Sequence, residues 1–353
     1  MRQSPDRLLL AVVIILAALG IVMAYSTGIG RDQGAALFRG HLAKGLVGTV
    51  GMVIAYKVGY RRWSAWAKKL LLPVNISLMG LLALKMINGG ICRWYRLGPF
   101  SFQPSEVAKL ILVLYMADFL ARKGEHVREF KRGVLPALIA CGVPLVLILA
   151  EPDLSTTVAV GGILGGMLFV GGVRIKHLAG IGLVIAMALG IVVLGLGHGR
   201  ERVLAYLGKG DEASRYQMEQ SLVALGAGGV FGRGLGMGVQ KHWFLPESHT
   251  DFVFSVVGEE LGLVGTLGVL GLFALYGWRG MSIARRVGEV RGFLVAVGIT
   301  LMVEVYALSN IAVATGILPT TGLPLPFVSY GGTSLVVSLA GSGILLDVSR
   351  GER

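Results

Sequence analysis

The sequence is poor in charged residues. Only 15% of its 353 residues are Asp, Glu, Lys or Arg, whereas 54% are hydrophobic. Soluble domains carry roughly a quarter charged residues, so this composition argues against an ordinary water-soluble enzyme. A lipid bilayer accepts the apolar faces that water rejects. We therefore expect an integral membrane protein.

Cysteine and acidic residues are also scarce. The two cysteines, Cys92 and Cys141, fall in a loop and in an apolar run, and their spacing fits neither a disulfide framework nor a metal site. We therefore expect no metal site built from cysteine ligands. Lys and Arg outnumber Asp and Glu by 33 to 20. No soluble basic segment is present to hold a duplex, so the excess favours membrane topology and anionic lipid over nucleic acid.

Apolar runs that are long enough to cross a bilayer recur along the whole chain. They predict an all-α, polytopic membrane protein of about ten transmembrane helices, forming a single domain over residues 1–353. The N-terminal run is too long for a cleaved signal peptide and is interpreted as the first span. The expected spans are Leu8–Thr27, His41–Val58, Lys69–Ile87, Pro104–Ala121, Gly133–Ala150, Thr156–Val173, His177–Leu196, Asp251–Trp278, Gly292–Gly316 and Phe327–Val348.

Short connections rich in Lys and Arg alternate with connections that contain few of them. Arg61 and Arg62, for example, follow the second span, and Arg285 and Arg286 follow the eighth. The positive-inside rule places these connections in the cytoplasm, and with them both termini. The long connection of residues 197–250, between spans seven and eight, then lies outside. Its apolar, glycine-rich part Gln220–Val230 predicts a re-entrant or interfacial helix.

The strongest cluster of reactive side chains is the segment Leu245–Phe252. Asp251 falls at the outer mouth of the eighth span, beside His249 and Thr250. A carboxylate at this depth could act as a general base toward a substrate at the membrane surface. The alternative is that Thr250 or Asp251 simply caps the helix.

Two further groups of carboxylates stand out, one within the eighth span and one in an outside connection between the fifth and sixth spans. Glu259 and Glu260 follow within the eighth span, where a buried carboxylate is either functional or held in a structural ion pair. Glu151 and Asp153 could bind a cation or position a hydroxyl, or could belong to a solvated turn.

The glycine-rich stretch Gly226–Gly238 is not expected to bind a nucleotide, because no strand precedes it and no Walker lysine follows.

A second cluster precedes and enters the fourth span. Arg93, Trp94 and Arg96 form either an aromatic belt with snorkelling arginines or a cationic site for a phosphate-bearing lipid. Glu106 and Lys109 are three residues apart on one helix face, which predicts an ion pair that lowers the cost of each charge in the membrane.

Five sequence blocks together resemble the SEDS family, the shape, elongation, division and sporulation proteins. They follow one another in order over nearly the whole chain, and they look more like the division and sporulation members than the elongation member. Cys92 stands where a basic residue is common, and Tyr306 where a glutamine is expected. The blocks are Arg93–Gly98, Phe102–Lys109, Glu151–Asp153, Tyr216–Glu260 and Asn310–Arg350.

The resemblance implies an inverting peptidoglycan glycosyltransferase that polymerises lipid II at the outer face of the bacterial cytoplasmic membrane. Asp251 would accept the proton of the acceptor hydroxyl. The diphosphate would be stabilised by cations, with or without a divalent ion such as Mg²⁺ or Mn²⁺. The candidate substrate-binding residues are Arg93, Trp94, Arg96, Glu106, Lys109, Asp153, Arg215, Gln217, His249 and Ser329.

The same resemblance implies a class B penicillin-binding protein as partner, together with other membrane proteins of the division or elongation machinery. Two other classes of function stay open at this point. One is a lipid II flippase, and the other is a non-catalytic scaffold for cell-wall synthases.

Overall fold

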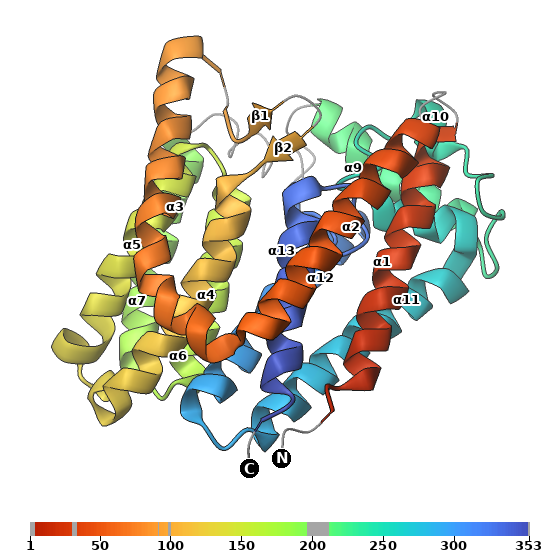
Figure 1. Cartoon of the computed structure of the whole chain (residues 1–353). Coiled ribbons are helices and arrows are strands. Elements are labelled where there is room, and N and C mark those ends of the chain that lie inside the picture. Colours follow the sequence, from red (N-terminus) through yellow and green to blue (C-terminus); the bar gives the residue numbers. More distant parts are fainter. Residues whose placement is uncertain (1–3, 30–33, 91, 98–99, 196–211, 352–353) are drawn as a thin grey trace.

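The computed structural model describes residues 4–29, 34–90, 92–97, 100–195 and 212–351, and its long helices form one bundle (Figure 1). Ten of the described helices match the ten predicted spans in order, so the predicted all-α membrane fold is confirmed. Five of the predicted spans are long and apolar enough to cross a membrane by length and composition alone. The ten helices are α1 (Arg7–Gly28), α2 (Gly34–Val58), α3 (Tyr60–Asn88), α4 (Pro104–Lys123), α5 (Leu135–Ala150), α6 (Leu154–Val170), α7 (Ile175–Gly195), α11 (Val253–Arg286), α12 (Val290–Ala314) and α13 (Gly332–Val348).

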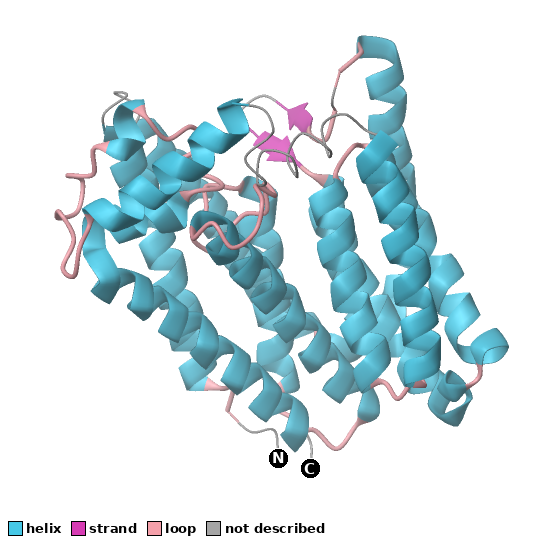
Figure 2. Ribbon diagram, turned by 180° about the vertical axis from the view of Figure 1, so that it is seen from behind, coloured by secondary structure: helices cyan, strands magenta, loops and turns pink. Residues whose placement is uncertain are grey.

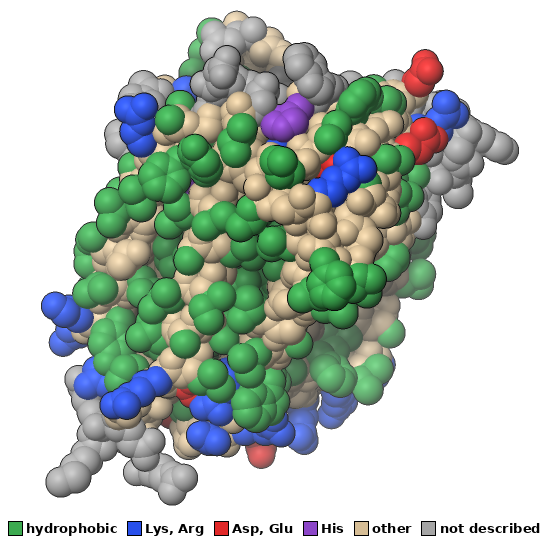
Figure 3. All heavy atoms as spheres, turned by 90° about the vertical axis from the view of Figure 1, so that its right-hand side faces the viewer, with side chains coloured by type: hydrophobic (Ala, Val, Ile, Leu, Met, Phe, Trp, Pro, Cys, Tyr) green, Lys and Arg blue, Asp and Glu red, His purple; other side chains and the backbone are tan. Residues whose placement is uncertain are grey.

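Both chain ends lie at the same end of the bundle (Figure 1). The connections predicted to be cytoplasmic gather there too: Arg279 of α11 pairs with Asp6, and Arg61 Nε lies 2.9 Å from Glu289 Oε2. Figure 3 shows hydrophobic side chains across the middle of one face, with Lys and Arg gathered at its lower end. This distribution is the one expected of a bundle that crosses a bilayer.

The opposite end of the bundle carries the small elements (Figures 1 and 2). They are the antiparallel strands β1 (Tyr95–Leu97) and β2 (Phe100–Phe102), and the helices α9 (Glu212–Ala227) and α10 (Gln240–Trp243). α9 contains most of the apolar stretch that predicted a helix in the long connection, and residues 197–211 of that connection lie outside the described residues. At the termini end, η2 (Gly124–Arg128) and η3 (Phe130–Val134) join α4 to α5.

Several helices begin or end at other residues than the apolar runs indicated. α3 starts at Tyr60 rather than Lys69, because its first turns are basic and exposed, and long basic side chains can reach the interface from a helix. α11 continues past the predicted end at Trp278 to Arg286, and its last turn is likewise basic. α13 starts at Gly332 rather than Phe327, since Phe327 has a left-handed backbone with φ of 67°.

α4 and α12 form the centre of the bundle. Nearly every residue of α4 from Pro104 to Leu120 is buried, and Pro104 occupies the first helical turn, as predicted. α12 is buried along most of its length as well. The polar residues of these two helices therefore face protein rather than lipid, which makes them structural or functional by position.

Candidate active site

Asp251 lies in a tight turn that leads into α11 at the end of the bundle opposite the termini. Its N–H donates to the Glu247 carbonyl at 3.1 Å, and Glu247 has a left-handed φ of 51°. The N-cap of α11 is Phe252, so neither Thr250 nor Asp251, the alternative considered above, occupies the N-cap position itself. Thr250 instead donates to Glu247 Oε2 at 2.9 Å, within the turn itself.

The backbone of this turn is fixed by residues from two other segments. Asn310 of α12 donates through Nδ2 to the carbonyl of Asp251, at 2.8 Å. The Ser329 hydroxyl donates to the Thr250 carbonyl at 2.5 Å, and the Tyr330 N–H donates to the His249 carbonyl at 2.8 Å.

Three successive carbonyls are therefore bound by groups outside the turn. The Asp251 carboxylate projects from a backbone that is already in place, which is the arrangement that a positioned catalytic group needs.

The segment that supplies Ser329 is itself anchored to the same helix. Asn310 uses its Nδ2 group a second time, donating to the Leu323 carbonyl at 2.8 Å. The Ser329 hydroxyl accepts a hydrogen bond from the Leu325 N–H at 2.8 Å. Ser329, predicted to bind substrate, thus links the backbone of the Asp251 turn to the backbone of its own segment at Leu325.

The predicted ion pair between Glu106 and Lys109 is confirmed. Lys109 Nζ lies 2.8 Å from Glu106 Oε2, and both side chains are 2% exposed. The ammonium also lies 3.5 Å from the centroid of the Tyr306 ring. Tyr306 precedes Asn310 by four residues on α12, so the pair lies about 6 Å deeper in the bundle than the Asp251 turn.

Arg93 binds the turn between α5 and α6. Its Nε donates to the Glu151 carbonyl at 3.2 Å, and its guanidinium also donates to the Pro152 carbonyl. Asp153 caps α6 by accepting from the Thr156 N–H at 3.3 Å. Arg93 and Asp153, both predicted to bind substrate, therefore hold this turn in shape.

Glu151 is fully buried in that turn, outside the spanning helices. Neither of its carboxylate oxygens has a hydrogen-bond partner among the described residues. Burial, and then the neighbouring Asp153, raise the pKa of Glu151 to about 8, although Arg93 and Lys85 oppose the shift. The raised pKa favours the protonated form of Glu151, which weakens it as an anionic ligand.

The other predicted site residues lie on separate elements. Trp94 and Arg96 are exposed near the β1–β2 hairpin, where Arg96 pairs in register with Ser101. Arg215 lies on α9, where its Nε is 3.5 Å from Glu219 Oε1, and Gln217 lies on the same helix. The structure thus brings His249, Asp251 and Ser329 together, with Glu106 and Lys109 one turn deeper.

Comparison with known proteins identifies the family. Residues 6–353 match the family model for the FtsW, RodA and SpoVE proteins, described as "Cell cycle protein". The chain belongs to this family, the SEDS family. The predicted resemblance is therefore confirmed over nearly the full sequence.

Two curated relatives cover almost the whole chain. The probable peptidoglycan glycosyltransferase FtsW of Trichlorobacter lovleyi is 38% identical over 98% of this chain and 93% of its own length. Stage V sporulation protein E of Bacillus subtilis is 37% identical over 100% of this chain and 99% of its own length. Among solved structures, a chain of a peptidoglycan synthase complex superimposes with a TM-score of 0.79, at 32% identity and 98% coverage of both chains. The rod shape determining protein RodA of Thermus thermophilus gives 0.70, at 31% identity and 98% and 97% coverage.

Glu259 and Glu260 of this SEDS protein have structural partners. Glu259 Oε1 accepts from the Val239 N–H at 2.7 Å, and Glu260 pairs with Lys241 where both side chains are fully buried. Ser26 of α1 joins the second pair, donating to Glu260 Oε1 at 2.6 Å. Glu260 is therefore held in a structural ion pair, one of the two interpretations given above, and Glu259 accepts hydrogen bonds from the backbone N–H groups of Val239 and Gln240.

The glycine-rich stretch packs its backbone directly onto α11. Gly262 interrupts this helix with a φ of 67°, and a Cβ there would lie 2.3 Å from the Gly232 nitrogen. The Leu263 N–H donates to the Gly229 carbonyl at 2.9 Å across the same contact. The glycines therefore serve a close backbone approach rather than a phosphate.

Sequence reasoning missed three residues beside the Asp251 turn. They are Asn310, which sequence analysis places only at the start of a family block, and His41 and Lys44 of α2. His41 and Lys44 lie within the second predicted span, three residues apart. Polar residues at helical spacing in an apolar run are a sequence signal for a functional position. Tyr330 brings them to the site, since the rings of His41 and Tyr330 stack at 5.7 Å.

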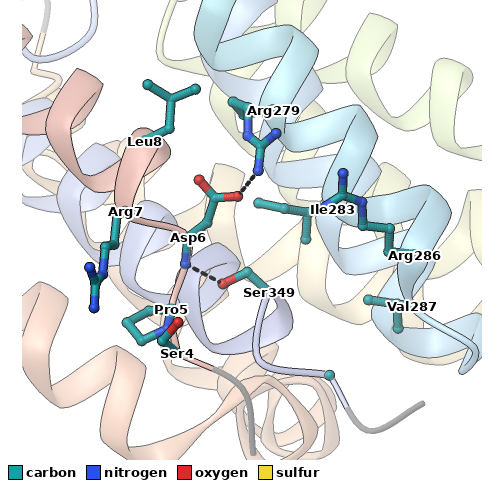
Figure 4. Close-up of a pocket in the computed structure, with 11 residues that line it drawn as sticks. Ser4, Pro5, Asp6, Arg7, Leu8, Arg279, Ile283, Arg286, Val287 and Ser349 are labelled. Carbon is teal, nitrogen blue, oxygen red and sulfur yellow. Dashed lines mark hydrogen bonds and ion pairs between the residues drawn. The ribbon is translucent and has the colours of Figure 1, made fainter.

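A cavity of about 340 Å³ lies at the termini end, away from the Asp251 turn (Figure 4). Asp6, Arg279 and Ser349 line it. Asp6 accepts from Arg279 through its side chain, and its N–H donates to Ser349 Oγ at 3.0 Å. These contacts fasten the start of α1 to α11 and to the end of α13.

Proposed function

We propose that this SEDS protein polymerises lipid II into β-1,4-linked glycan strands at the outer face of the cytoplasmic membrane. Family membership and the names of its curated relatives make it a peptidoglycan glycosyltransferase. The observation that carries the finer proposal is the Asp251 turn. Its backbone is bound by Asn310, Ser329 and Tyr330 at the end of the bundle opposite the termini.

Asp251 acts in this proposal as the general base. It accepts the proton of the acceptor sugar's 4-hydroxyl while that oxygen attacks the anomeric carbon of the donor. The bond between this carbon and the diphosphate oxygen breaks, its electron pair leaves with the diphosphate, and the configuration inverts. Asp251 suits this role because the sugar head group cannot enter the hydrocarbon core, and Asp251 lies in the turn just before α11, at the end of the bundle opposite the termini.

The diphosphate needs positive charge that Asp251 does not supply. Lys109 is positioned one helical turn deeper, although Glu106 shares its charge. The described residues include no group of three or more His, Cys, Asp or Glu side chains that could hold a metal ion. In this proposal a Mg²⁺ or Mn²⁺ ion would enter the site bound to the substrate diphosphate.

Orientation follows from the basic end of the bundle. In this proposal both termini, Arg61 and Arg279 face the cytoplasm, so Asp251 faces the compartment where glycan is built. A reporter that works only in the cytoplasm is expected to be active when it is fused to the C-terminus, and one that works only outside the cytoplasm is expected to be inactive there. The reverse pattern would overturn this topology. We further propose a class B penicillin-binding protein as partner, because a similar solved chain comes from a peptidoglycan synthase complex.

The direct test uses purified protein and labelled lipid II in detergent, with and without the partner transpeptidase. A glycosyltransferase forms glycan polymers under these conditions. A flippase only moves lipid II between the two faces of a membrane, and a scaffold only holds other enzymes. Neither forms a glycosidic bond, so neither produces polymer in detergent. Absence of polymer with the partner present would refute the proposed activity.

A further inference from the structure

A lysine of α2 lies against an aromatic ring next to the Asp251 turn. Lys44 Nζ is 3.9 Å from the centroid of the Tyr330 ring. His41, one turn earlier on α2, is fully buried and stacks on the same ring. An ammonium over an aromatic face is attracted by the ring and keeps hydrogen-bond donors available on its other side.

Tyr330 connects this lysine to the candidate active site. Its N–H donates to the His249 carbonyl at 2.8 Å, and its ring lies 5.8 Å from the His249 ring. A Cβ added at Gly332, the first residue of α13, would lie 3.3 Å from Cε of Lys44. Lys44 therefore lies at the outer end of α13, beside the turn that carries Asp251.

Three of the four other cations considered for the diphosphate have partners, and the fourth, Arg96, is exposed on the β1–β2 hairpin. Lys109 pairs with Glu106, and Arg215 pairs with Glu219. Arg93 donates to two backbone carbonyls of the turn between α5 and α6. Among the described residues, Lys44 pairs with no carboxylate, so its positive charge is available to an anionic ligand.

We propose that Lys44, held on the Tyr330 ring, binds a phosphate group of the donor's polyprenyl diphosphate. The inference rests on the proposed function and adds a residue and a ligand group to it. As the anomeric bond breaks, negative charge grows on the departing diphosphate oxygen, and an ammonium donating to that diphosphate stabilises it. Asp251 and Lys44 would then act on the two partners of one reaction, the acceptor hydroxyl and the leaving group.

Binding of a soluble analogue tests the site without requiring turnover. Purified wild-type protein in detergent is titrated with farnesyl diphosphate, farnesol and inorganic diphosphate, followed by calorimetry. Lys44→Ala is expected to weaken farnesyl diphosphate binding by roughly 10- to 100-fold, the loss of one charge-assisted hydrogen bond. Lys44→Arg is expected to keep most of the affinity. Lys57→Ala, at the other end of α2, is the matched control and is expected to bind as the wild type does.

The arms separate the possible results. Farnesol should bind equally to wild type and Lys44→Ala, because it lacks the phosphates. Equal binding of farnesyl diphosphate by Lys44→Ala and wild type overturns the proposal, and so does an equal loss in Lys57→Ala, which would mark a general charge effect. If wild type binds the diphosphate through Lys44 but forms no glycan from lipid II, the proposed polymerase fails and the phosphate site stands.

Thermal unfolding identifies a variant that fails to fold. Should Lys44→Ala unfold at a lower temperature, Tyr330→Phe provides the second measurement. It keeps the aromatic face and is expected to bind farnesyl diphosphate like the wild type, whereas Tyr330→Leu removes the ring and is expected to weaken binding. Equal affinity in both Tyr330 variants would also overturn the proposal.

Discussion

The buried pair of Glu106 and Lys109 gives a prediction whose size follows from the structure. Both side chains are 2% exposed, and their charged atoms are 2.8 Å apart. Removing one partner leaves the other charge buried without compensation, which costs about 3–5 kcal/mol. At about 2 °C per kcal/mol for a chain of this size, Glu106→Gln or Lys109→Met should lower the unfolding midpoint by about 6–10 °C.

Replacing both partners should cost much less than the two single changes together, because no isolated charge is left. Thermal unfolding of the purified protein in detergent, followed by tryptophan fluorescence, measures all three variants. Glu129 and Arg132 form the control pair: they have the same spacing but are 51% and 72% exposed. Their removal should change the midpoint little. Additive effects of Glu106→Gln and Lys109→Met would refute the reasoning.

Three further predictions concern the residues that shape the site. Gly262→Ala should lower both the unfolding midpoint and the activity, because its Cβ would meet the backbone of the glycine-rich stretch. Gly268→Ala, on the open face of α11, is the control and should leave both unchanged. Glu151 has a folded-state pKa of about 8 against an ordinary 4.5, so its contribution to stability is present at low pH and is lost as the pH rises from about 4.5 to about 8. Glu151→Gln should flatten the fall in unfolding midpoint between pH 5 and pH 8, and an unchanged profile would count against this reasoning. Asn310→Ala removes the donor that binds the Asp251 and Leu323 carbonyls, so it should lower the unfolding midpoint by a few degrees and reduce kcat about 100-fold. An unchanged kcat would show that the turn keeps its shape without Asn310.

The bundle could be predicted from the sequence because hydrophobic length and basic connections are local signals. Ten apolar runs gave the ten helices, and the connections rich in Lys and Arg gathered at one end. The boundaries were less accurate where helices continue past the apolar run, as at Tyr60 and Arg286, since composition there does not mark the end of the hydrogen-bonded ladder.

The site could be predicted only where its contacts are close in sequence. Glu106 and Lys109 are three residues apart, so helical spacing alone indicated their pair. The contact between Asn310 and Asp251 joins residues 59 positions apart, and the ring of Tyr330 meets Lys44 from the far end of the chain. Such contacts depend on how the helices pack, which no local pattern specifies.

The central claim is that the Asp251 carboxylate is the catalytic base, and Asp251→Asn tests it most directly. Asparagine keeps the shape of the side chain and removes its basicity, while Asn310, Ser329 and Tyr330 still bind the backbone around it. Purified Asp251→Asn should unfold at the wild-type temperature and polymerise lipid II at least about 100-fold more slowly, the usual contribution of a positioned base. Polymerisation at close to the wild-type rate would contradict the account.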